Sequence, residues 1–235
     1  MKTVVILAAG VGSRLRPITN NVPKSMVPVN GTPLLIRFLN QIIMSGVECK
    51  VIIVAGYLSK KITEVVSDID INVEVIINEE YEATNNMESC RLALEYGDYG
   101  DCIIVNADCI YDDRIVLEMM SMQESCVAID SSQYCEENMK ISISGHYITE
   151  ISKDLTDQEG IYTSIDLYHF VKSDVDRLLV IMQSYNKRSD LQKWNEVAIN
   201  ELVKICQVKP CDFNGVRWME IDNHNDLNNA EELFR

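Results

Sequence analysis

The chain has 235 residues, of which 47% are hydrophobic and 24% charged, and its formal net charge at pH 7 is −15. This composition is typical of a globular protein with enough residues for one substantial core. The excess of 36 acidic over 21 basic residues argues against a nucleic-acid-binding protein and against binding to an anionic membrane surface. No stretch approaches the ~20 apolar residues of a membrane span, and the N-terminal apolar run is too short for a signal peptide. We therefore expect a cytoplasmic protein.

The eight cysteines include no Cys-x-x-Cys pair, and several lie in apolar runs. Buried, reduced thiols are therefore a better interpretation than a zinc site or a disulfide framework. The three histidines lie in no motif, and we interpret them as structural or surface residues.

The first 31 residues hold the strongest functional pattern. Lys2–Leu7 is rich in Val and Ile, which predicts a buried strand. It leads into small residues and two glycines, a composition that lets backbone N–H groups close on a phosphate. Arg14, Arg16 and Lys24 follow in a proline-containing segment. A strand, a glycine-rich loop and fixed cations together predict an anion-binding site.

Two other phosphate-binding loops fit this segment less well. A dinucleotide-binding fingerprint requires a third glycine where the chain has Leu15. A P-loop requires Gly-Lys-Ser/Thr at the end of its turn, and this is missing.

Strand and helix patterns alternate in the first half of the chain. The expected elements are a helix at 33–46, a strand at 51–55, a helix at 58–66, a strand at 73–77, a helix at about 86–96 and a strand at 101–107. This alternation predicts a parallel sheet with helices on both faces. Ligands of such sheets bind at the carboxyl ends of strands, where Gly10, the Asn85-Asn86 turn and Asp108 lie.

The second half is less regular. We expect strands at 125–129, 162–171 and 218–222, a hairpin of 139–143 with 146–151, and helices at 173–183, 190–205 and 225–234. No linker or repeat interrupts the chain, which predicts one domain over 1–235. Its nucleotide-binding half would span about 1–110 and its acceptor-binding half about 111–235.

A family resemblance rests on two motifs. Leu7–Leu15 has the pattern Leu-Ala-Ala-Gly-x-Gly-x-Arg-Leu, and Pro23-Lys24-Ser25-Met26 follows. Together they resemble the signature of nucleotidyltransferases, which join a nucleoside triphosphate to a phosphorylated small molecule. The family includes sugar-1-phosphate nucleotidylyltransferases and a smaller branch of cytidylyltransferases for phosphocholine and similar phospho-alcohols or phosphonates. The resemblance implies a Rossmann-like α/β fold, with a doubly wound, mostly parallel sheet and a small antiparallel substrate-binding insertion.

The resemblance also implies roles for single residues. Nucleotide-binding positions would be Leu7, Ala8, Ala9, Gly10, Gly12, Ser13, Arg14 and Lys24, of which Arg14 and Lys24 would also be catalytic. Asp108 ends a strand, where a carboxylate suits Mg²⁺, and it matches a metal-binding aspartate of the family. Asp222 resembles the second metal ligand. Alternatively, Asp108 is a turn or N-cap residue. Asn106 departs from the Asp or Gly usual in the family.

The implied reaction is the attack of a substrate phosphate or phosphonate oxygen on the α-phosphorus of the nucleotide, with release of pyrophosphate. A phosphate monoester is largely ionised at neutral pH, so no Ser–His or Cys–His pair is needed. The barrier lies in bringing two anions together, which Mg²⁺ and the cations Arg14 and Lys24 would lower. Lys140 and Lys153 resemble family lysines that hold the acceptor phosphate or the α-phosphate, and Lys153 is the stronger catalytic candidate.

The segment Thr84–Ser89 is the basis for predicting the nucleotide. Its sequence Thr-Asn-Asn-x-x-Ser looks like the cytidylyltransferase branch, and side-chain amides can recognise a base edge. We therefore predict that Asn85, Asn86 and Ser89, together with Asp108, contact CTP. A helix-capping asparagine is the structural alternative, and it does not exclude base contact.

The acceptor is less well defined by the sequence. A quaternary ammonium group would be held by aromatic faces and carboxylates. The acceptor candidates are Tyr111, Lys140, Lys153, Tyr162, Asp166, Trp194 and Glu196. Trp194 also fits an apolar helical stripe with Leu191, Ala198 and Leu202, which predicts core packing instead. Gln158–Tyr162 lacks the Gly-Glu-rich segment common to sugar enzymes, which favours a small phospho-alcohol or phosphonate.

Three functions remain open. The first is a Mg²⁺-dependent cytidylyltransferase that uses CTP and a small phosphorylated acceptor, as a monomer or homodimer. The second is a sugar-1-phosphate nucleotidylyltransferase that uses UTP, dTTP or GTP. The third is an inactive nucleotide-binding regulatory module, which would tend to lose residues such as Arg14, Lys24, Asp108 and Asp222.

Overall fold

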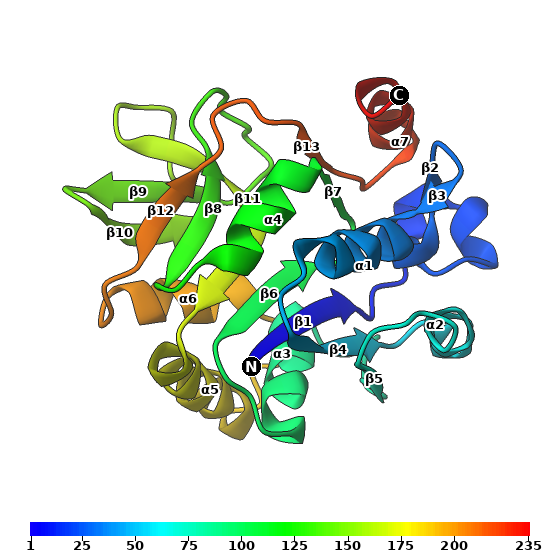
Figure 1. Ribbon diagram of the computed structural model, residues 1–235. Helices are drawn as coiled ribbons and strands as arrows, with labels where there is room; N and C mark the ends of the chain where they lie inside the picture. Colours follow the sequence, from blue (N-terminus) through cyan, green and yellow to red (C-terminus); the bar gives the residue numbers. More distant parts are fainter.

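A computed structural model describes all residues from Met1 to Arg235 (Figure 1). The strands are β1 Lys2–Ala8, β2 Pro28–Val29, β3 Thr32–Pro33, β4 Cys49–Ala55, β5 Val73–Ile77, β6 Cys102–Asn106, β7 Cys109–Tyr111, β8 Cys126–Asp130, β9 Lys140–Ser144, β10 Tyr147–Ser152, β11 Ile161–Phe170, β12 Lys209–Asp212 and β13 Trp218–Glu220. The α-helices are α1 Leu34–Ser45, α2 Ser59–Val66, α3 Asn86–Tyr96, α4 Asp113–Ser121, α5 Lys172–Lys187, α6 Asn195–Val203 and α7 His224–Leu233. Three short 3₁₀ helices, Ser13–Leu15, Ile18–Asn20 and Lys24–Met26, follow β1.

The central sheet has nine strands, with the main order β10-β9-β11-β6-β1-β4-β5. The run β6-β1-β4-β5 is parallel, whereas β11 is antiparallel to β6, β8 and β9. The predicted parallel sheet is therefore confirmed for the first half of the chain. Because β11 pairs directly with β6, strands from both predicted halves share one sheet.

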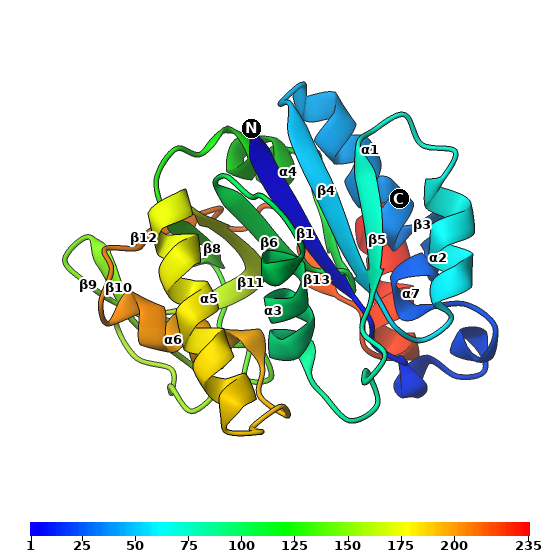
Figure 2. The same cartoon turned by 90° about the horizontal axis from the view of Figure 1, so that it is seen from below.

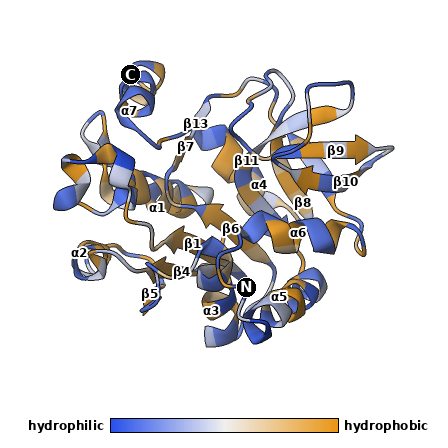
Figure 3. Cartoon of the chain, turned by 180° about the vertical axis from the view of Figure 1, so that it is seen from behind, coloured by the Kyte–Doolittle hydropathy of each residue, from blue (hydrophilic) through white to orange (hydrophobic).

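Helices cover both faces of the sheet (Figure 2). Side chains of α1, α2 and α4 pack on one face, and those of α3, α5 and α6 pack on the other. The two faces of the strands supply two separate apolar clusters, of 29 and 26 buried residues. Figure 3 shows hydrophobic colour concentrated in the central strands and hydrophilic colour on outward parts of the helices. This is the doubly wound arrangement that the alternating pattern predicts.

β1 is the centre of this architecture because all seven of its residues are buried. Its two neighbours are β4 and β6, so the chain moves to one side of β1 first and to the other side later. The carboxyl end of β1 is thus a topological switch point, where open α/β sheets bind their ligands. The loop that begins at Ala9 lies at this point.

The second half contains the predicted hairpin, formed by β9 and β10 in antiparallel register. Two further parallel-paired strands, β8 and β12, extend the sheet beside β11. Helix α4 is an element that sequence reasoning missed. Its N-terminus is capped by the Asp112 side chain, which accepts a hydrogen bond from Arg114 N, and it packs against α1. No helix in the structure has the length and apolar character needed to cross a membrane.

The helix predicted over 190–205 is shorter in the structure, and it begins only at Asn195. Trp194 is its N-cap residue, with an extended backbone and 44% of its surface exposed. The prediction that Trp194 packs in the core is therefore wrong. Asn195 N donates a hydrogen bond to Asn86 Oδ1, 2.8 Å away, so the start of α6 is fixed by the start of α3.

Candidate active site

The loop after β1 turns through Gly12, whose φ of +65° lies in the left-handed region that favours glycine. A Cβ atom here would lie 2.9 Å from Lys24 Cβ and 3.2 Å from Thr19 Cγ2. The Thr19 hydroxyl donates a hydrogen bond to Gly12 O at 2.8 Å, which holds the two segments together. The second glycine of the motif is thus needed for Lys24 to pack against the loop.

Asp108 and Asp222 are brought together by a small separate sheet. β13 pairs antiparallel with β7, which puts Glu220 opposite Cys109, and Ile221 N donates to Asp108 O at 2.9 Å. The carboxylate of Asp226 then accepts hydrogen bonds from the backbone of Asp222 and Asn223 as part of a capping box that starts α7. Asp226 therefore lies in the first turn of α7, and it also fixes the backbone of Asp222.

Lys24 lies between these two aspartates. Its ammonium nitrogen is 2.5 Å from Asp108 Oδ2 and 2.6 Å from Asp222 Oδ1, and Arg14 Nη2 is 2.8 Å from Asp222 Oδ2. Burial alone would lower the pKa of Lys24, but the charges and hydrogen bonds of both carboxylates outweigh it and raise the pKa. Burial would raise the pKa of Asp222, but Lys24 and Arg14 hold it below its usual value. Lys24 and Asp222 are therefore ionised at neutral pH.

Glu220 is a third carboxylate of this group and was missed by sequence reasoning. One oxygen from each of Asp108, Glu220 and Asp222 can be chosen so that all three lie within 4.8 Å of one another. Burial, followed by the charges of Asp108 and Asp222, raises the pKa of Glu220 to about 8. Three hard oxygen donors this close together fit a divalent cation. The strand period of two could have identified Glu220, because residues i and i+2 of a strand share a face.

A cavity of about 260 Å³ lies beside the carboxylates. Its lining includes, among others, Leu7, Ala9, Gly10, Asn85, Asn86, Ser89, Asp108, Lys153, Asp166, Trp194 and Glu196, all of them residues that the sequence pointed to. It also includes residues that sequence reasoning missed: Asn78, Tyr81, Asn138, Met139 and Glu137. Ala8 is buried within β1, and the exposed Ser13 does not reach the cavity. The switch point of the sheet is therefore a real pocket, lined from both halves of the chain.

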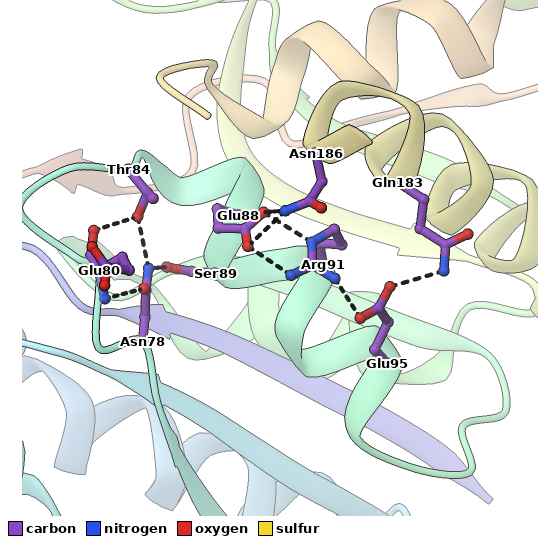
Figure 4. A network of polar contacts seen from close by, with 9 residues as sticks. All are labelled: Asn78, Glu80, Thr84, Glu88, Ser89, Arg91, Glu95, Gln183 and Asn186. Carbon is purple, nitrogen blue, oxygen red and sulfur yellow. Dashed lines mark hydrogen bonds and ion pairs between the residues drawn. The ribbon is translucent and has the colours of Figure 1, made fainter. Parts of the chain in front are cut away.

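The segment Thr84–Ser89 is held by one buried asparagine (Figure 4). The amide nitrogen of Asn78 donates to the hydroxyls of Thr84 and Ser89, each at 3.0 Å, and Asn78 Oδ1 accepts from Glu80 N at 3.0 Å. Thr84 in turn donates to Glu80 O. Asn78 is only 2% exposed. This network gives the wall of the cavity one fixed shape.

The two asparagines of this segment bond to the protein itself. Asn85 is the N-cap of α3: its side-chain oxygen accepts from Asn86 N, and its amide donates to Gln192 O at 3.4 Å. The Asn86 amide donates to Asn106 Oδ1 at 3.3 Å and accepts from Asn195 N. The capping alternative is thus correct for Asn85. Each amide keeps one N–H and one lone pair for a ligand.

The far side of α3 is tied to α5 by charged groups (Figure 4). Arg91 forms ion pairs with Glu88 and Glu95, and Glu88 also accepts from Asn186 of α5. Gln183 of α5 donates to Glu95 at 2.8 Å. Because α3 starts at the cavity, these contacts hold the Asn85-Asn86 turn in position.

Four acceptor candidates meet in the cavity. The Lys153 ammonium lies 4.7 Å from the centre of the Trp194 ring. Asp166 and Glu196 are 7% and 3% exposed, and both contact the hydroxyl of the buried Tyr168. Burial, together with their neighbouring acidic groups, raises the pKa of Asp166, and burial raises the pKa of Glu196.

Three other acceptor candidates lie outside the cavity. Tyr111 is 2% exposed, and its hydroxyl donates to Ile165 O inside the core. Lys140 is 1% exposed, and its ammonium group donates to Glu136 O at 2.8 Å. Tyr162 packs on the apolar cluster beneath α3, α5 and α6. Tyr111 and Lys140 are buried in packed protein and Tyr162 is half-buried, which residue type alone does not predict.

Known proteins resemble this chain over most or all of its length. The bifunctional IPC transferase and DIPP synthase of Aquifex aeolicus is 28% identical over the whole chain, which spans about half (52%) of that protein. The 2-aminoethylphosphonate cytidylyltransferase of Lancefieldella rimae is 26% identical over 86% of this chain and 80% of its own length. The CTP:phosphocholine cytidylyltransferase of Streptococcus pneumoniae has the same fold, with a TM-score of 0.81 over both full chains at 20% identity.

The sequence model of the nucleotidyl transferase family matches residues 3–133, which is more than half of the chain. The matched region runs from β1 through β8 and includes the glycine-rich loop, Lys24, the Asn85-Asn86 turn and Asp108. The chain therefore belongs to the nucleotidyl transferase family.

Proposed function

We propose that this protein is a CTP-dependent cytidylyltransferase. It transfers CMP to a small acceptor that carries a phosphate or phosphonate group and releases pyrophosphate. One observation carries the proposal: Asp108, Glu220 and the Thr84–Ser89 segment line the same cavity at the end of β1, and Lys24 reaches Asp108 there. CTP as the nucleotide is supported by a relative that is a cytidylyltransferase and that aligns with most of this chain.

The triphosphate would bind across the loop after β1. Gly10 lines the cavity there, and the adjoining turn at Gly12 brings Lys24 alongside. Lys24 carries a permanent positive charge because its pKa is raised. Arg14 is 64% exposed at its side chain, so it is free to turn from Asp222 to a phosphate that arrives from solvent. Both cations would neutralise charge on the pyrophosphate as it leaves.

Asp108 and Asp222, with Glu220 beside them, would hold Mg²⁺. When bound there, the ion would polarise the α-phosphoryl oxygens and reduce the repulsion between the two anionic reactants. The residues themselves position the reactants. The acceptor phosphate needs no general base because its second pKa is about 6. The absence of a histidine or a nucleophilic serine pair from the cavity lining agrees with this requirement.

The acceptor would lie toward the second half of the chain. Lys153 is the only lysine that lines the cavity, which makes it the cation that meets the acceptor phosphate. Its position over Trp194 keeps the ammonium group at the cavity wall.

A panel of substrates tests the proposal. Pyrophosphate release is measured with Mg²⁺ for CTP, UTP, dTTP, ATP and GTP. Each nucleotide is combined with small phospho-alcohols, aminoalkylphosphonates, inositol and glycerol phosphates, and hexose-1-phosphates. We expect turnover with CTP and a small phospho-alcohol or phosphonate. Turnover confined to UTP or dTTP with a hexose-1-phosphate would refute the proposal in favour of a sugar nucleotidylyltransferase, and nucleotide binding without turnover would favour the regulatory module.

A variant separates chemistry from binding. Asp108→Asn keeps the size of the side chain but weakens a metal ligand, so we expect pyrophosphate release to fall by about 10²–10³. Asp98→Asn, which changes the same residue type in the loop before β6, is the control. Equal rates of pyrophosphate release for both variants would refute the role of Asp108 as a metal ligand in the reaction.

A further inference from the structure

Two carboxyl groups of the cavity share a single hydrogen-bond donor. Tyr168 Oη lies 3.1 Å from Asp166 Oδ1 and 3.0 Å from Glu196 Oε1. A phenolic hydroxyl has one proton and can donate to only one of them. No other side chain donates a hydrogen bond to either carboxyl group. Both residues are more than nine-tenths buried, and both line the cavity.

The backbone holds this pair in place. Asp166 has a φ of +57° within β11, at a point where the register of β11 with β8 shifts. Aspartate is one of the few residues that adopt this conformation at low cost. Glu196 projects from the first turn of α6, whose start is fixed by Asn86. The two acids therefore come from separate elements that are each rigidly positioned.

Acidic side chains outnumber basic side chains in the lining of the cavity. Five carboxyl groups line it, those of Asp108, Glu137, Asp166, Glu196 and Glu220, and Lys153 is the one cation of the lining. Lys24 and a bound divalent ion would neutralise the carboxylates at Asp108. Neither Asp166 nor Glu196 forms a salt bridge, and Lys153 acts on Glu196 only through its charge. A neutral ligand would leave them with unpaired, buried oxygen atoms, which is unfavourable.

We propose that Asp166 and Glu196, with Tyr168, bind a primary ammonium group of the acceptor, at the end opposite its phosphate or phosphonate. This inference rests on the proposed function and specifies the acceptor as an aminoalkyl phosphate or phosphonate. A primary ammonium has three N–H donors, so it can bond to both carboxylates at once while Tyr168 keeps its own hydrogen bond.

The geometry disfavours acceptors that end in a trimethylammonium group or in a hydroxyl group. A trimethylammonium group has no N–H donor and would add no hydrogen bond to the one that Tyr168 supplies to the pair. Its binding also depends on open aromatic faces, and Lys153 already lies over one face of Trp194, 4.7 Å from the ring centre. A hydroxyl group can donate one hydrogen bond but brings no charge to the pair.

Equilibrium binding tests the inference without requiring turnover. Three acceptors that differ only at one end are titrated into the protein by calorimetry: phosphoethanolamine, 2-hydroxyethyl phosphate and phosphocholine. We expect phosphoethanolamine to bind at least about tenfold more tightly than the other two, as loss of a charge-assisted hydrogen bond predicts. 2-Aminoethylphosphonate should also bind more tightly than 2-hydroxyethyl phosphate and phosphocholine, because it carries the same primary ammonium group as phosphoethanolamine.

Two substitutions should remove that preference. Asp166→Asn keeps a residue that tolerates positive φ, and Glu196→Gln keeps the size of the side chain. In each variant the advantage of phosphoethanolamine over 2-hydroxyethyl phosphate should fall at least about fivefold, with CTP affinity unchanged within about twofold. Glu64→Gln, which removes one exposed negative charge on α2, should keep the full preference.

Equal affinity of the wild-type protein for the three acceptors would overturn the inference, as would a preference that survives in both variants. The proposed function fails separately, when no combination of CTP and acceptor releases pyrophosphate. An ammonium preference without turnover would support the binding subsite and refute the cytidylyl transfer.

Discussion

Lys24→Met is the substitution that most directly tests the description of the site. Methionine has nearly the same length as lysine but carries no charge. In the structure, the Lys24 ammonium group is the shared partner of Asp108 at 2.5 Å and of Asp222 at 2.6 Å. Its loss leaves two neighbouring carboxylates, together with Glu220, without their main counter-charge.

The magnitude follows from burial. Removing one partner of a fully buried ion pair costs about 3–5 kcal/mol. Here Asp108 and Asp222 keep 24% and 22% of their side-chain surface exposed, and Arg14 stays beside Asp222. We therefore expect a smaller loss of about 2 kcal/mol, or about 4–8 °C in Tm for a chain of this length. Loss of a cation from the triphosphate should also lower kcat by about 10²–10³.

The assays are thermal unfolding with and without Mg²⁺, and pyrophosphate release with CTP. Mg²⁺ should stabilise Lys24→Met more than the wild-type protein, because the ion no longer competes with an ammonium group for the same carboxylates. Lys60→Met, which removes an exposed lysine of α2, is the control and should behave as wild type. A variant with a lowered Tm but the wild-type rate would refute the catalytic role of Lys24, and an unchanged Tm would refute the ion-pair geometry.

Three further predictions concern the elements that support the site. Gly12→Ala forces a Cβ to within 2.9 Å of Lys24 at a φ of +65°, and should destabilise the protein by about 1–2 kcal/mol in urea unfolding, whereas Gly10→Ala meets no atom and should not. Arg91→Met leaves the largely buried carboxylate of Glu88 with only the amide of Asn186 as a partner and should cost about 2 kcal/mol, which an unchanged Tm would contradict. Burial lowers the pKa of His169, so as the pH falls this imidazole is protonated in the unfolded chain before it is protonated in the folded protein. Stability should therefore fall by about 1.4 kcal/mol per pH unit as pH drops below about 6.5, until His169 is also protonated in the folded state. Unfolding curves of His169→Gln at pH 7 and 5.5 should lack this component, and the same slope in the variant would contradict it.

The local pattern of the sequence determined most of the fold. The residues Thr3–Leu7 are all apolar or β-branched, so the burial of this part of β1 follows from composition. The loop that follows contains glycines and cations in one continuous segment, and its ligand type could be predicted without any distant contact. Asp108 is similar, because it directly follows a strand whose end must lie at the ligand-binding edge.

Other features depended on distant segments. Helix α6 starts after Trp194 because Asn195 N bonds to Asn86, a residue more than a hundred positions earlier. The sequence analysis predicted a longer helix with Trp194 in the core. An apolar stripe does not show where a contact with a distant residue makes the helix begin. Tyr111, Lys140 and Tyr162 have suitable chemistry for a ligand, but strand direction and packing turned them away from the cavity.

The sequence by itself pointed to the family, the alternation of strands and helices, and the candidate residues Lys24, Asp108 and Asp222. Only the tertiary structure decided that Glu220 joins the carboxylates and that Asp166 and Glu196 share the hydroxyl of Tyr168. The physical reason is the range of the interactions. Strand burial and loop conformation depend on neighbours in the chain, whereas the charge environment of a carboxyl group depends on which distant strands and helices pack around it.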